Sequence, residues 1–162
     1  MHDDEAVRHE RYMRRCLELA ALALESADSP VGAVVVRRDT VVGLGSEGVK
    51  ARGDVTAHAE IVAVRAACAH LGTLDLTDAT LYTTVEPCAM CAYAIRLARV
   101  GTVVIGARAN AAGDSRCDGW HILTSQDAVP GRPVPATVNG VLAVACAARY
   151  AERRPPRPAE RA

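Results

Sequence analysis

The chain has 162 residues, half of which are hydrophobic and 23% of which are charged. A chain of this length can bury a hydrophobic core without disulfides, and its composition is typical of a folded domain rather than a disordered one. Its formal net charge is zero, which argues against a large nucleic-acid surface, because such surfaces are usually basic.

Six cysteines occur, at positions 16, 68, 88, 91, 117 and 146. The chain is too long to need disulfides, and its charged start, MHDDEAVRHERYMRRC, lacks the apolar core of a signal peptide. No uninterrupted apolar run is long enough to cross a bilayer. We therefore expect a cytoplasmic protein with reduced thiols and no membrane partner.

The first part of the chain predicts a helix followed by a β-hairpin. Residues 5–26 carry apolar side chains at spacings of three and four, which is typical of one buried helix face. Pro30 disfavours helix in the residue before it and so ends this helix. The β-branched stretches 31–38 and 40–45 are predicted strands joined by a short charged turn. A loop is expected over residues 45–55.

The middle of the chain alternates between helix and strand. The predicted elements are a helix at 57–70, a strand at 79–85, a helix at 88–97 and a strand at 99–107. Thr56 is a suitable N-cap for the first of these helices, and Pro87 suits the first turn of the second. The buried side of the first helix is predicted at Ile61, Val64, Ala67 and Cys68. This alternation indicates an α/β fold whose crossovers favour parallel strands.

Beyond residue 107 the pattern is weaker. Residues 108–132 read as a loop with one short helix, residues 133–140 as a last strand and residues 141–154 as a closing helix. We expect a single domain over 1–150 and a disordered tail, rich in proline and arginine, over 151–162.

Three residues near two predicted helix starts could bind a metal. Cys88 and Cys91 lie three positions apart at the start of one helix, where the positive helix end stabilises thiolates. His58 lies at the start of another helix. Three such ligands would leave a fourth zinc position open for water, which is the pattern of catalytic rather than structural zinc sites.

Glu60 follows His58 by two residues and could hold a proton beside such a water. Zinc lowers the pKa of a water that it binds to about 7. A hydroxide with a carboxylate beside it can attack an electrophilic carbon and move a proton to a leaving group. The sequence therefore favours a hydrolytic site in which Glu60 is the catalytic residue.

Each of these features alone has an ordinary explanation. A Cys-x-x-Cys pair in an intracellular protein can be a redox dithiol or two core thiols. A single histidine at a helix start can serve capping or packing, and the helix dipole favours a first-turn glutamate without any catalytic role. The conjunction of His-x-Glu and Pro-Cys-x-x-Cys at successive helix starts is more specific.

This conjunction resembles the zinc-dependent cytidine deaminase superfamily. The residues that carry the resemblance are His-Ala-Glu at 58–60 and Pro-Cys-Ala-Met-Cys at 87–91, and the likeness extends over residues 10–125. In detail the chain is most similar to the branch that holds tRNA adenosine deaminases, guanine deaminases and fungal-type cytosine deaminases.

The resemblance implies a three-layer α/β/α fold around a mixed five-stranded sheet, and commonly a homodimer. It implies one Zn²⁺ per chain, with a bound water or hydroxide, held by His58, Cys88 and Cys91. Glu60 would move a proton from this water to a ring nitrogen and then to the departing amine, and the backbone N–H of Ala59 would help hold the ring. The implied reaction replaces an exocyclic amine by a carbonyl and releases ammonia.

One departure from the family concerns the loop after the second strand. That branch usually has an asparagine there that hydrogen-bonds the substrate, whereas this chain places Glu47 at the aligned position. Asparagine both donates and accepts, while an ionised glutamate only accepts. If Glu47 faces the pocket, the substrate edge should be rich in N–H donors, as in guanine or a diaminotriazine. The alternative is a solvated loop charge.

A second departure lies in the loop at 110–121. Trp120, the only tryptophan, could cap the pocket and stack on a base, or serve core packing or a dimer contact. Asp114 and Asp118 could be acids near the substrate, since guanine deaminases carry acids in this region, or solvated loop acids. Trp120 and Asp114 are thus candidate substrate-binding residues beside Ala59 and Glu47.

Three classes of function remain open. The first is a hydrolase that deaminates a small heterocyclic amine, such as guanine, cytosine, an aminotriazine or a nucleoside, and the neutral charge and Glu47 favour it. The second is a tRNA adenosine deaminase, favoured by the stretches at 30–36 and 56–61 and by an Arg-rich tail. The third is a non-catalytic protein with a structural zinc, which would leave Glu60 without a role.

Overall fold

The computed structural model describes residues 3–109 and 119–152, and the structural statements below concern these residues. Its elements in chain order are α1 (Asp3–Glu25), β1 (Gly32–Arg37), β2 (Thr40–Ser46), α2 (Val49–Arg52), α3 (Ala59–Leu71), β3 (Ala79–Val85), α4 (Ala89–Leu97), β4 (Thr102–Ala107), α5 (Gly119–Thr124), β5 (Ala136–Asn139) and α6 (Ala143–Ala151).

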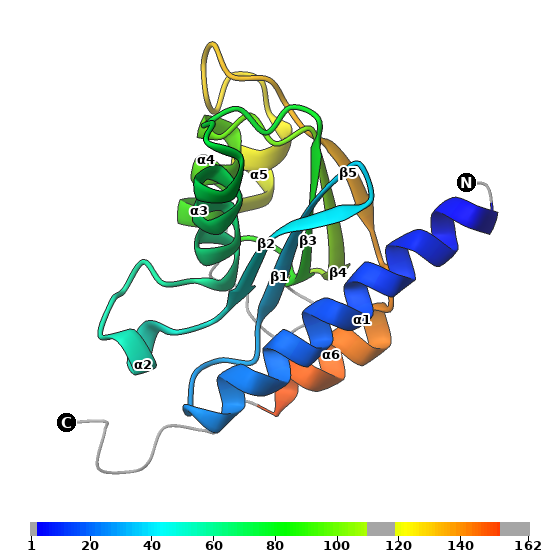
Figure 1. Ribbon diagram of the computed structural model, residues 1–162, viewed down its shortest axis with the longest axis vertical. Helices are drawn as coiled ribbons and strands as arrows, with labels where there is room; N and C mark the ends of the chain where they lie inside the picture. Colours follow the sequence, from blue (N-terminus) through cyan, green and yellow to red (C-terminus); the bar gives the residue numbers. More distant parts are fainter. Residues whose placement is uncertain (1–2, 110–118, 153–162) are drawn as a thin grey trace.

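The five strands form one mixed sheet in the order β2-β1-β3-β4-β5. Strand β1 pairs antiparallel with both β2 and β3, while β3, β4 and β5 pair in parallel. Helices α1 and α6 cover one face of this sheet, and α3, α4 and α5 lie on the other (Figure 1). The predicted three-layer α/β/α architecture with a mixed five-stranded sheet is confirmed.

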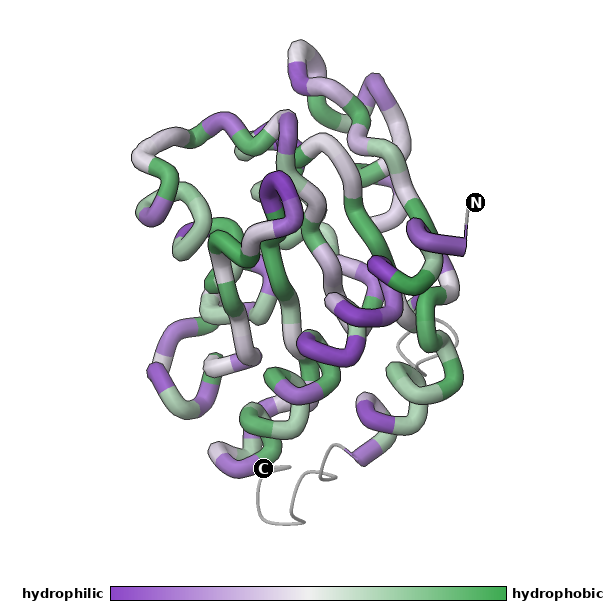
Figure 2. The backbone as a smooth tube through the Cα atoms, turned by 45° about the vertical axis from the view of Figure 1, so that its right-hand side comes forward, coloured by the Kyte–Doolittle hydropathy of each residue, from purple (hydrophilic) through white to green (hydrophobic). Residues whose placement is uncertain are grey.

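The central strands form the core between the two helical layers. Most residues of β1, β3 and β4 are buried, because helices cover both faces of the sheet. Along the backbone tube in Figure 2, hydrophobic segments (green) alternate with hydrophilic ones (purple), as expected for elements with one buried side. No helix among the described residues is long and apolar enough to span a membrane.

Two glycines let α3 lie unusually close to the sheet edge. A Cβ atom at Gly45 would lie 1.9 Å from the carbonyl oxygen of Ala59, and one at Gly43 would lie 2.2 Å from that of Ala63. Neither position therefore has room for a side chain. This contact fixes the start of α3, which carries His58 and Glu60, against β2.

Small residues, rather than the larger ones expected, make up much of the buried side of α3. The buried residues are Ala59, Glu60, Ala63, Val64 and Ala67. The prediction was wrong for Ile61 and Cys68, which are only half-buried. The close approach of the glycine-containing strand selects alanines at a spacing of four, which a hydrophobicity pattern underestimates.

Several local predictions also need correction. The loop at 45–55 contains the short helix α2, whose first N–H groups donate to the Asp28 carboxylate, from Lys50 at 2.7 Å and from Ala51 at 3.1 Å. The N-cap of α3 is His58 rather than Thr56, because the Thr56 hydroxyl donates to Asp54 instead. Pro87 precedes the N-cap of α4 and so lies just outside its first turn.

The predicted parallel pairing holds for only part of the sheet. Strands β2 and β3, which the helix α3 connects, point the same way but are separated by β1. The β1–β2 hairpin therefore inserts an antiparallel strand into the crossover. The carboxyl ends of β2, β3 and β4 still meet at one edge of the sheet, where α3 and α4 begin.

Candidate active site

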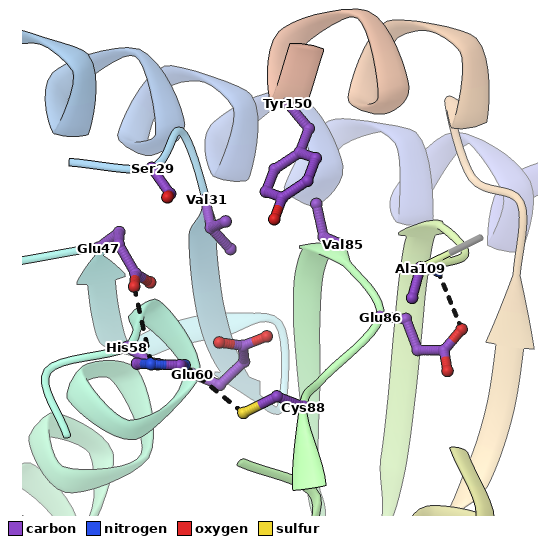
Figure 3. A pocket seen from close by; sticks show the side chains of 10 residues that line it. All are labelled: Ser29, Val31, Glu47, His58, Glu60, Val85, Glu86, Cys88, Ala109 and Tyr150. Atoms are coloured by element: carbon purple, nitrogen blue, oxygen red, sulfur yellow. Dashed lines mark hydrogen bonds and ion pairs between the residues drawn. The ribbon is translucent and has the colours of Figure 1, made fainter. Parts of the chain in front are cut away.

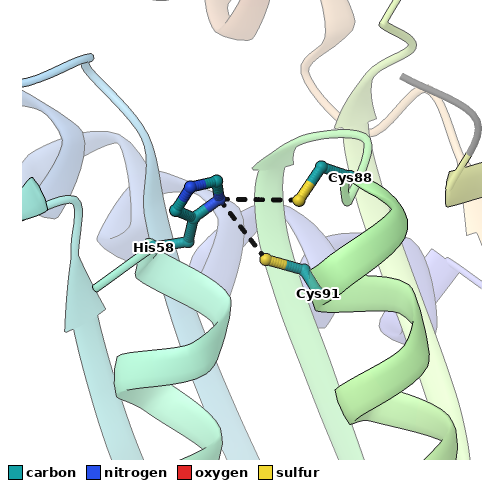
Figure 4. A group of neighbouring side chains, drawn as sticks. All are labelled: His58, Cys88 and Cys91. Carbon is teal, nitrogen blue, oxygen red and sulfur yellow. Dashed lines mark hydrogen bonds between the residues drawn. The ribbon is translucent and has the colours of Figure 1, made fainter. Parts of the chain in front are cut away.

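The starts of α3 and α4 present the candidate metal ligands. His58 is the N-cap of α3 and Cys88 is the N-cap of α4, both in extended backbone conformation, and neither side chain makes a capping hydrogen bond. Both side chains are therefore turned away from their own helices and toward each other (Figure 4). Cys91 lies within the first turn of α4 and is fully buried.

The distances among these three side chains match a zinc site. Nδ1 of His58 lies 3.5 Å from Sγ of Cys88 and 3.6 Å from Sγ of Cys91, and all three atoms lie within 4.8 Å of one another. A tetrahedral zinc with ordinary bond lengths separates its nitrogen and sulfur ligands by about 3.6 Å. The donor set and its spacing thus fit a zinc ion with three protein ligands and one open position.

The three groups also form a coupled proton-binding cluster. The hydrogen bond with Cys91 lowers the pKa of Cys88 to about 4, and the hydrogen bond with Cys88 raises the pKa of His58 to about 9. The hydrogen bond with Cys88, followed by burial, raises the pKa of Cys91. Zinc needs all three groups deprotonated, so its binding releases protons and its affinity falls as the pH falls.

Glu60 lies beside this cluster in a buried position. Its side chain is 4% exposed, and its Oε1 lies 3.0 Å from the hydroxyl of Thr83 on β3. The same hydroxyl lies 3.0 Å from the carbonyl oxygen of Val85, so its single proton serves one acceptor at a time. Burial raises the pKa of Glu60, which makes its carboxylate a better proton acceptor near neutral pH.

Glu47 faces the pocket rather than the solvent. Its side chain is 10% exposed, and Oε2 accepts the backbone N–H of Ala59 at 3.1 Å. Oε1 lies 3.9 Å from Nε2 of His58, the ring nitrogen that points away from the two sulfurs. Burial, followed by the charge of Glu60, raises the pKa of Glu47 to about 7. The N–H of Ala59, which was expected to meet the substrate, therefore has Glu47 as its partner.

A pocket of about 270 Å³ opens over these residues. Figure 3 shows Glu47 and His58 on one side, Cys88 and Glu60 at the base, and Tyr150 descending from α6 on the far side. The full lining is Ser29, Val31, Glu47, His58, Glu60, Val85, Glu86, Cys88, Ala109 and Tyr150. Its volume lies near the lower end for small-molecule sites, so it suits one small ring system.

The structure separates the remaining candidates. The Trp120 ring does not line the pocket; the guanidinium of Arg108 lies 3.7 Å from its centroid instead. Asp114, Asp118 and Cys117 lie outside the described residues. Cys16 and Cys146 are fully buried in the core, whereas Cys68 is half-buried.

Several residues of the site were missed from the sequence, among them Tyr150, Thr83 and Glu86. Tyr150 reaches the pocket from the last helix. The one sequence feature that indicates its burial is its spacing of four from the buried Cys146. Thr83 was read as an ordinary strand residue, although it contacts Glu60. Glu86 lines the pocket, but its carboxylate is turned toward Ala109, whose N–H it accepts at 3.1 Å (Figure 3).

Comparison with known proteins agrees with this geometry. Residues 6–107 match the family model for the cytidine and deoxycytidylate deaminase zinc-binding region. This match includes the helix starts with His58, Glu60, Cys88 and Cys91. The fold, the His/Cys/Cys cluster and the match together define a zinc-binding deaminase domain, and the chain belongs to the cytidine and deoxycytidylate deaminase family.

Relatives in the family carry two different names. The chain is 38% identical over 98 residues to the tRNA-specific adenosine deaminase of Aquifex aeolicus, an alignment that covers 60% of this chain and 65% of that protein. It is 37% identical over 120 residues to the guanine deaminase of Bacillus subtilis, covering 74% of this chain and 77% of that protein. The chain thus spans just under two thirds of the adenosine deaminase.

Two solved structures lead to the same two kinds of deaminase. A structure described in studies of A-to-I editing by tRNA:A34 deaminases is 32% identical, covers 86% of this chain and 98% of its own, and has a TM-score of 0.74. The solved guanine deaminase of Bacillus subtilis is 36% identical, covers 78% of this chain and 82% of its own, and has a TM-score of 0.63. These relatives leave the substrate open between a free base and a tRNA.

Proposed function

We propose that the protein is a zinc-dependent hydrolytic deaminase that acts on a small nucleobase-like heterocycle. In the proposed reaction an exocyclic amine on a ring carbon is replaced by a carbonyl, and ammonia is released. The observation that carries the proposal is the buried carboxylate of Glu60 beside a three-ligand His/Cys/Cys site that leaves one position open.

In this proposal Glu60 carries the protons of the reaction. Zinc held by His58, Cys88 and Cys91 would supply a water with a lowered pKa. Glu60 takes one proton of the attacking water and delivers it to the ring nitrogen beside the amine-bearing carbon. It delivers the second water proton to the amine as the C–N bond breaks. The balance is one water consumed, one carbonyl and one ring N–H formed, and one ammonia released.

Glu47 is proposed to select the substrate edge. Its carboxylate is held by Ala59, so the backbone N–H expected to touch the ring would act through Glu47. A carboxylate only accepts hydrogen bonds, and it therefore favours a ring edge with N–H donors, such as the amide and amino groups of guanine or the amines of a diaminotriazine. Above pH 7, where Glu47 is ionised, a ring that presents only acceptors would bind poorly, because it would face Oε1 of the carboxylate without a donor.

The charge of the pocket favours an uncharged substrate over a phosphate-bearing one. Three of its lining side chains, Glu47, Glu60 and Glu86, are carboxylates, and none of the described lining residues is a lysine or an arginine. Arg108 neutralises Glu86 from outside the lining, through Nε at 2.5 Å from Oε2. The phosphate of a nucleotide would thus find no basic partner among the described lining residues.

A tRNA adenosine deaminase remains the second candidate. The similarity to a tRNA-specific adenosine deaminase and to a solved tRNA:A34 deaminase favours it. An RNA loop can place one flipped base in a small pocket while its phosphates stay outside. A homodimer likewise stays a prediction, which light scattering of the purified protein tests.

The proposal is tested by ammonia release from the zinc-loaded protein. The panel holds guanine, cytosine, adenine, their nucleosides, an aminotriazine and a tRNA anticodon stem-loop. Turnover of a free heterocycle that is lost in Glu60→Gln supports the proposed function. Turnover of the stem-loop alone assigns the protein to RNA editing, and no ammonia from any member would contradict the deaminase proposal for these substrates.

A further inference from the structure

Arg96 is a fully buried arginine in the helix that carries the two cysteines. It lies on α4, five residues after Cys91, and its exposure is 0%. Its two terminal nitrogens donate to four backbone carbonyls, those of Ile122, Ser125, Val129 and Arg132, at 2.8, 2.8, 3.3 and 2.7 Å. The ion pairs found among the described residues do not include Arg96, so carbonyl dipoles stabilise this buried charge there.

These carbonyls place Arg96 at the end of α5. Ile122 belongs to the last turn of α5 and Ser125 follows it directly. Carbonyls at a helix C-terminus lack partners within the helix and favour a cation. The planar guanidinium, with several donors in a fixed geometry, can bind all four at once, which a lysine could not do. Arg96 therefore fixes α5 and the segment after it against α4.

The other end of α5 lies directly on the segment that presents Cys88. A Cβ atom at Gly119, the first residue of α5, would lie 1.8 Å from the carbonyl oxygen of Pro87 and 2.7 Å from the carbonyl carbon of Cys88. Because the neighbours are backbone atoms, no side chain fits there. The start of α5 thus rests on the peptide of a candidate zinc ligand.

The second residue of α5 connects to the same segment by another route. The Trp120 ring carries the guanidinium of Arg108 at 3.7 Å from its centroid, a cation–π contact. Nε of Arg108 donates to Oε2 of Glu86, which also accepts the N–H of Ala109. Glu86 is two residues before Cys88, so the strand end before α4 is held from the side as well.

We infer that Arg96, Trp120, Arg108 and Glu86 form a brace that positions Cys88 for zinc. The brace links α4, α5 and the segment before α4. Arg96 holds α5 against α4, and Gly119 brings the start of α5 onto Pro87 and Cys88. Trp120 contacts Arg108, which binds Glu86. None of these side chains is a candidate metal ligand. Each is a positioning residue that acts through the backbone of residues 86–88. The inference depends on the zinc site but not on the proposed reaction.

The test is the zinc affinity of brace variants, measured by competition with a chromophoric chelator in the absence of substrate. Substitution of residues that hold metal ligands in place without binding the metal typically lowers metal affinity by roughly 10–100-fold. Arg96→Met and Trp120→Leu are each expected to weaken zinc binding by roughly tenfold, at a temperature where circular dichroism shows both to be folded. If Arg96→Met does not fold, Trp120→Leu carries the test, because its ring is only partly buried.

The matched control is Met13→Ala. Met13 is fully buried on α1, on the opposite face of the sheet from α4 and α5, so its truncation lowers stability without touching the brace. It is expected to keep zinc affinity within twofold of the wild type. If the brace variants lose stability and yet bind zinc as tightly as Met13→Ala, they are structural residues only, and the inference is overturned.

A double variant tests whether the brace is one unit. Because Arg96 and Trp120 both act through α5, Arg96→Met combined with Trp120→Leu is expected to weaken zinc binding by less than the product of the two single effects. Losses that multiply fully would mean two independent contacts and would overturn the single brace. Zinc binding without deamination would refute the proposed function and leave this inference intact.

Discussion

The two walls of the pocket are built from very different parts of the chain. The zinc wall, formed by His58, Glu60 and Cys88 with Cys91 buried behind them, comes from two helix starts separated by a single strand. The selecting wall, defined here by Glu47, Val31 and Tyr150, draws on the end of β2, the entry to β1 and the last helix. The candidate metal ligands and Glu60 thus come from short segments of the sequence, whereas the shape of the pocket on its other side depends on the packing of distant segments.

This difference predicts different consequences for mutations in the two walls. Changes in the zinc wall should abolish metal binding or turnover for every substrate. Changes in the selecting wall should alter which ring is turned over while the metal stays bound. The predictions below run from the largest expected effect to the smallest.

Cys91→Ala should remove zinc and reduce ammonia release to background. The variant leaves two ligands, too few to hold a catalytic zinc. Metal content by atomic absorption and ammonia release by a coupled assay measure the two effects. Cys68→Ala, on the half-buried side of α3, is the matched control and should keep both. A Cys91→Ala protein with full zinc content would refute the ligand assignment.

Glu60→Gln should keep zinc and lower kcat by roughly 10²–10⁴-fold, the usual contribution of a general acid–base. Glutamine preserves the shape and can still bond to Thr83, but it cannot carry the proton. Its unfolding temperature should not fall, since the substitution removes a carboxylate whose pKa burial has raised. Retention of wild-type kcat would show that another group moves the proton.

The residues of the zinc wall could be predicted from the sequence for a physical reason. Cys88 and Cys91 lie three positions apart at one helix start, so helix geometry brings both thiols to one face, and His58 and Glu60 lie two positions apart at the start of another helix. Five strands, and the helices that cover them, followed from hydrophobic periodicity. The order of the strands was less accessible, because the β1–β2 hairpin inserts β1 between β2 and β3.

The selecting wall was only partly accessible to the same reasoning. Glu47 was singled out by its difference from the expected asparagine, but its bond to Ala59 depends on the close approach of α3 to the glycines of β2. Tyr150 reaches the pocket because α6 packs beside it, and the position of α6 cannot be predicted from a local sequence pattern. For Trp120 a place over the pocket and a role in core packing were both open, and the residue packs against the core and contacts Arg108, a neighbour brought in by the end of β4.

Glu47→Gln should change selectivity more than turnover. Its amide oxygen can still accept the N–H of Ala59, so the site keeps its shape, while the loss of the charge weakens binding to N–H-rich edges. A charged hydrogen bond is worth about 1.5–3 kcal/mol, which predicts a drop of roughly 10–100-fold in kcat/KM for guanine-like rings, with zinc retained. An equal loss for all substrates would place Glu47 in the zinc wall instead.

Thr83→Val should have a smaller effect confined to the zinc wall. Valine matches the size of threonine but removes the hydroxyl 3.0 Å from Oε1 of Glu60. Loss of one hydrogen bond of about 1 kcal/mol predicts a decrease in kcat of roughly fivefold with little change in KM. A change in KM alone would indicate that Thr83 supports the selecting wall.

His9→Gln should leave both walls unaffected and change only the pH dependence of stability. His9 is 3% exposed, and its Nδ1 lies 3.0 Å from the Tyr82 hydroxyl. Burial lowers its pKa below 6.5, so the folded protein favours the neutral ring. The contribution of His9 to the free energy of unfolding is therefore full above pH 6.5. It is lost as the pH falls through the lowered pKa of His9 in the folded protein.

The measurement for His9→Gln is the urea midpoint of unfolding between pH 5 and pH 8. The wild type should lose stability on acidification more steeply than the variant, with equal ammonia release at pH 8. Identical slopes for the two proteins would mean that the ring is not kept neutral by the fold.

The decisive measurement compares ammonia release from a free base and from the corresponding nucleoside 5′-monophosphate by the zinc-loaded protein, with guanine and GMP as the first pair and guanosine as the control for the ribose. The carboxylate-lined pocket predicts that guanine is turned over and that GMP, whose phosphate finds no described basic partner there, is turned over at least about 100-fold more slowly. Turnover of the phosphate-bearing substrate alone would contradict the division into a zinc wall and a wall that selects a small uncharged ring.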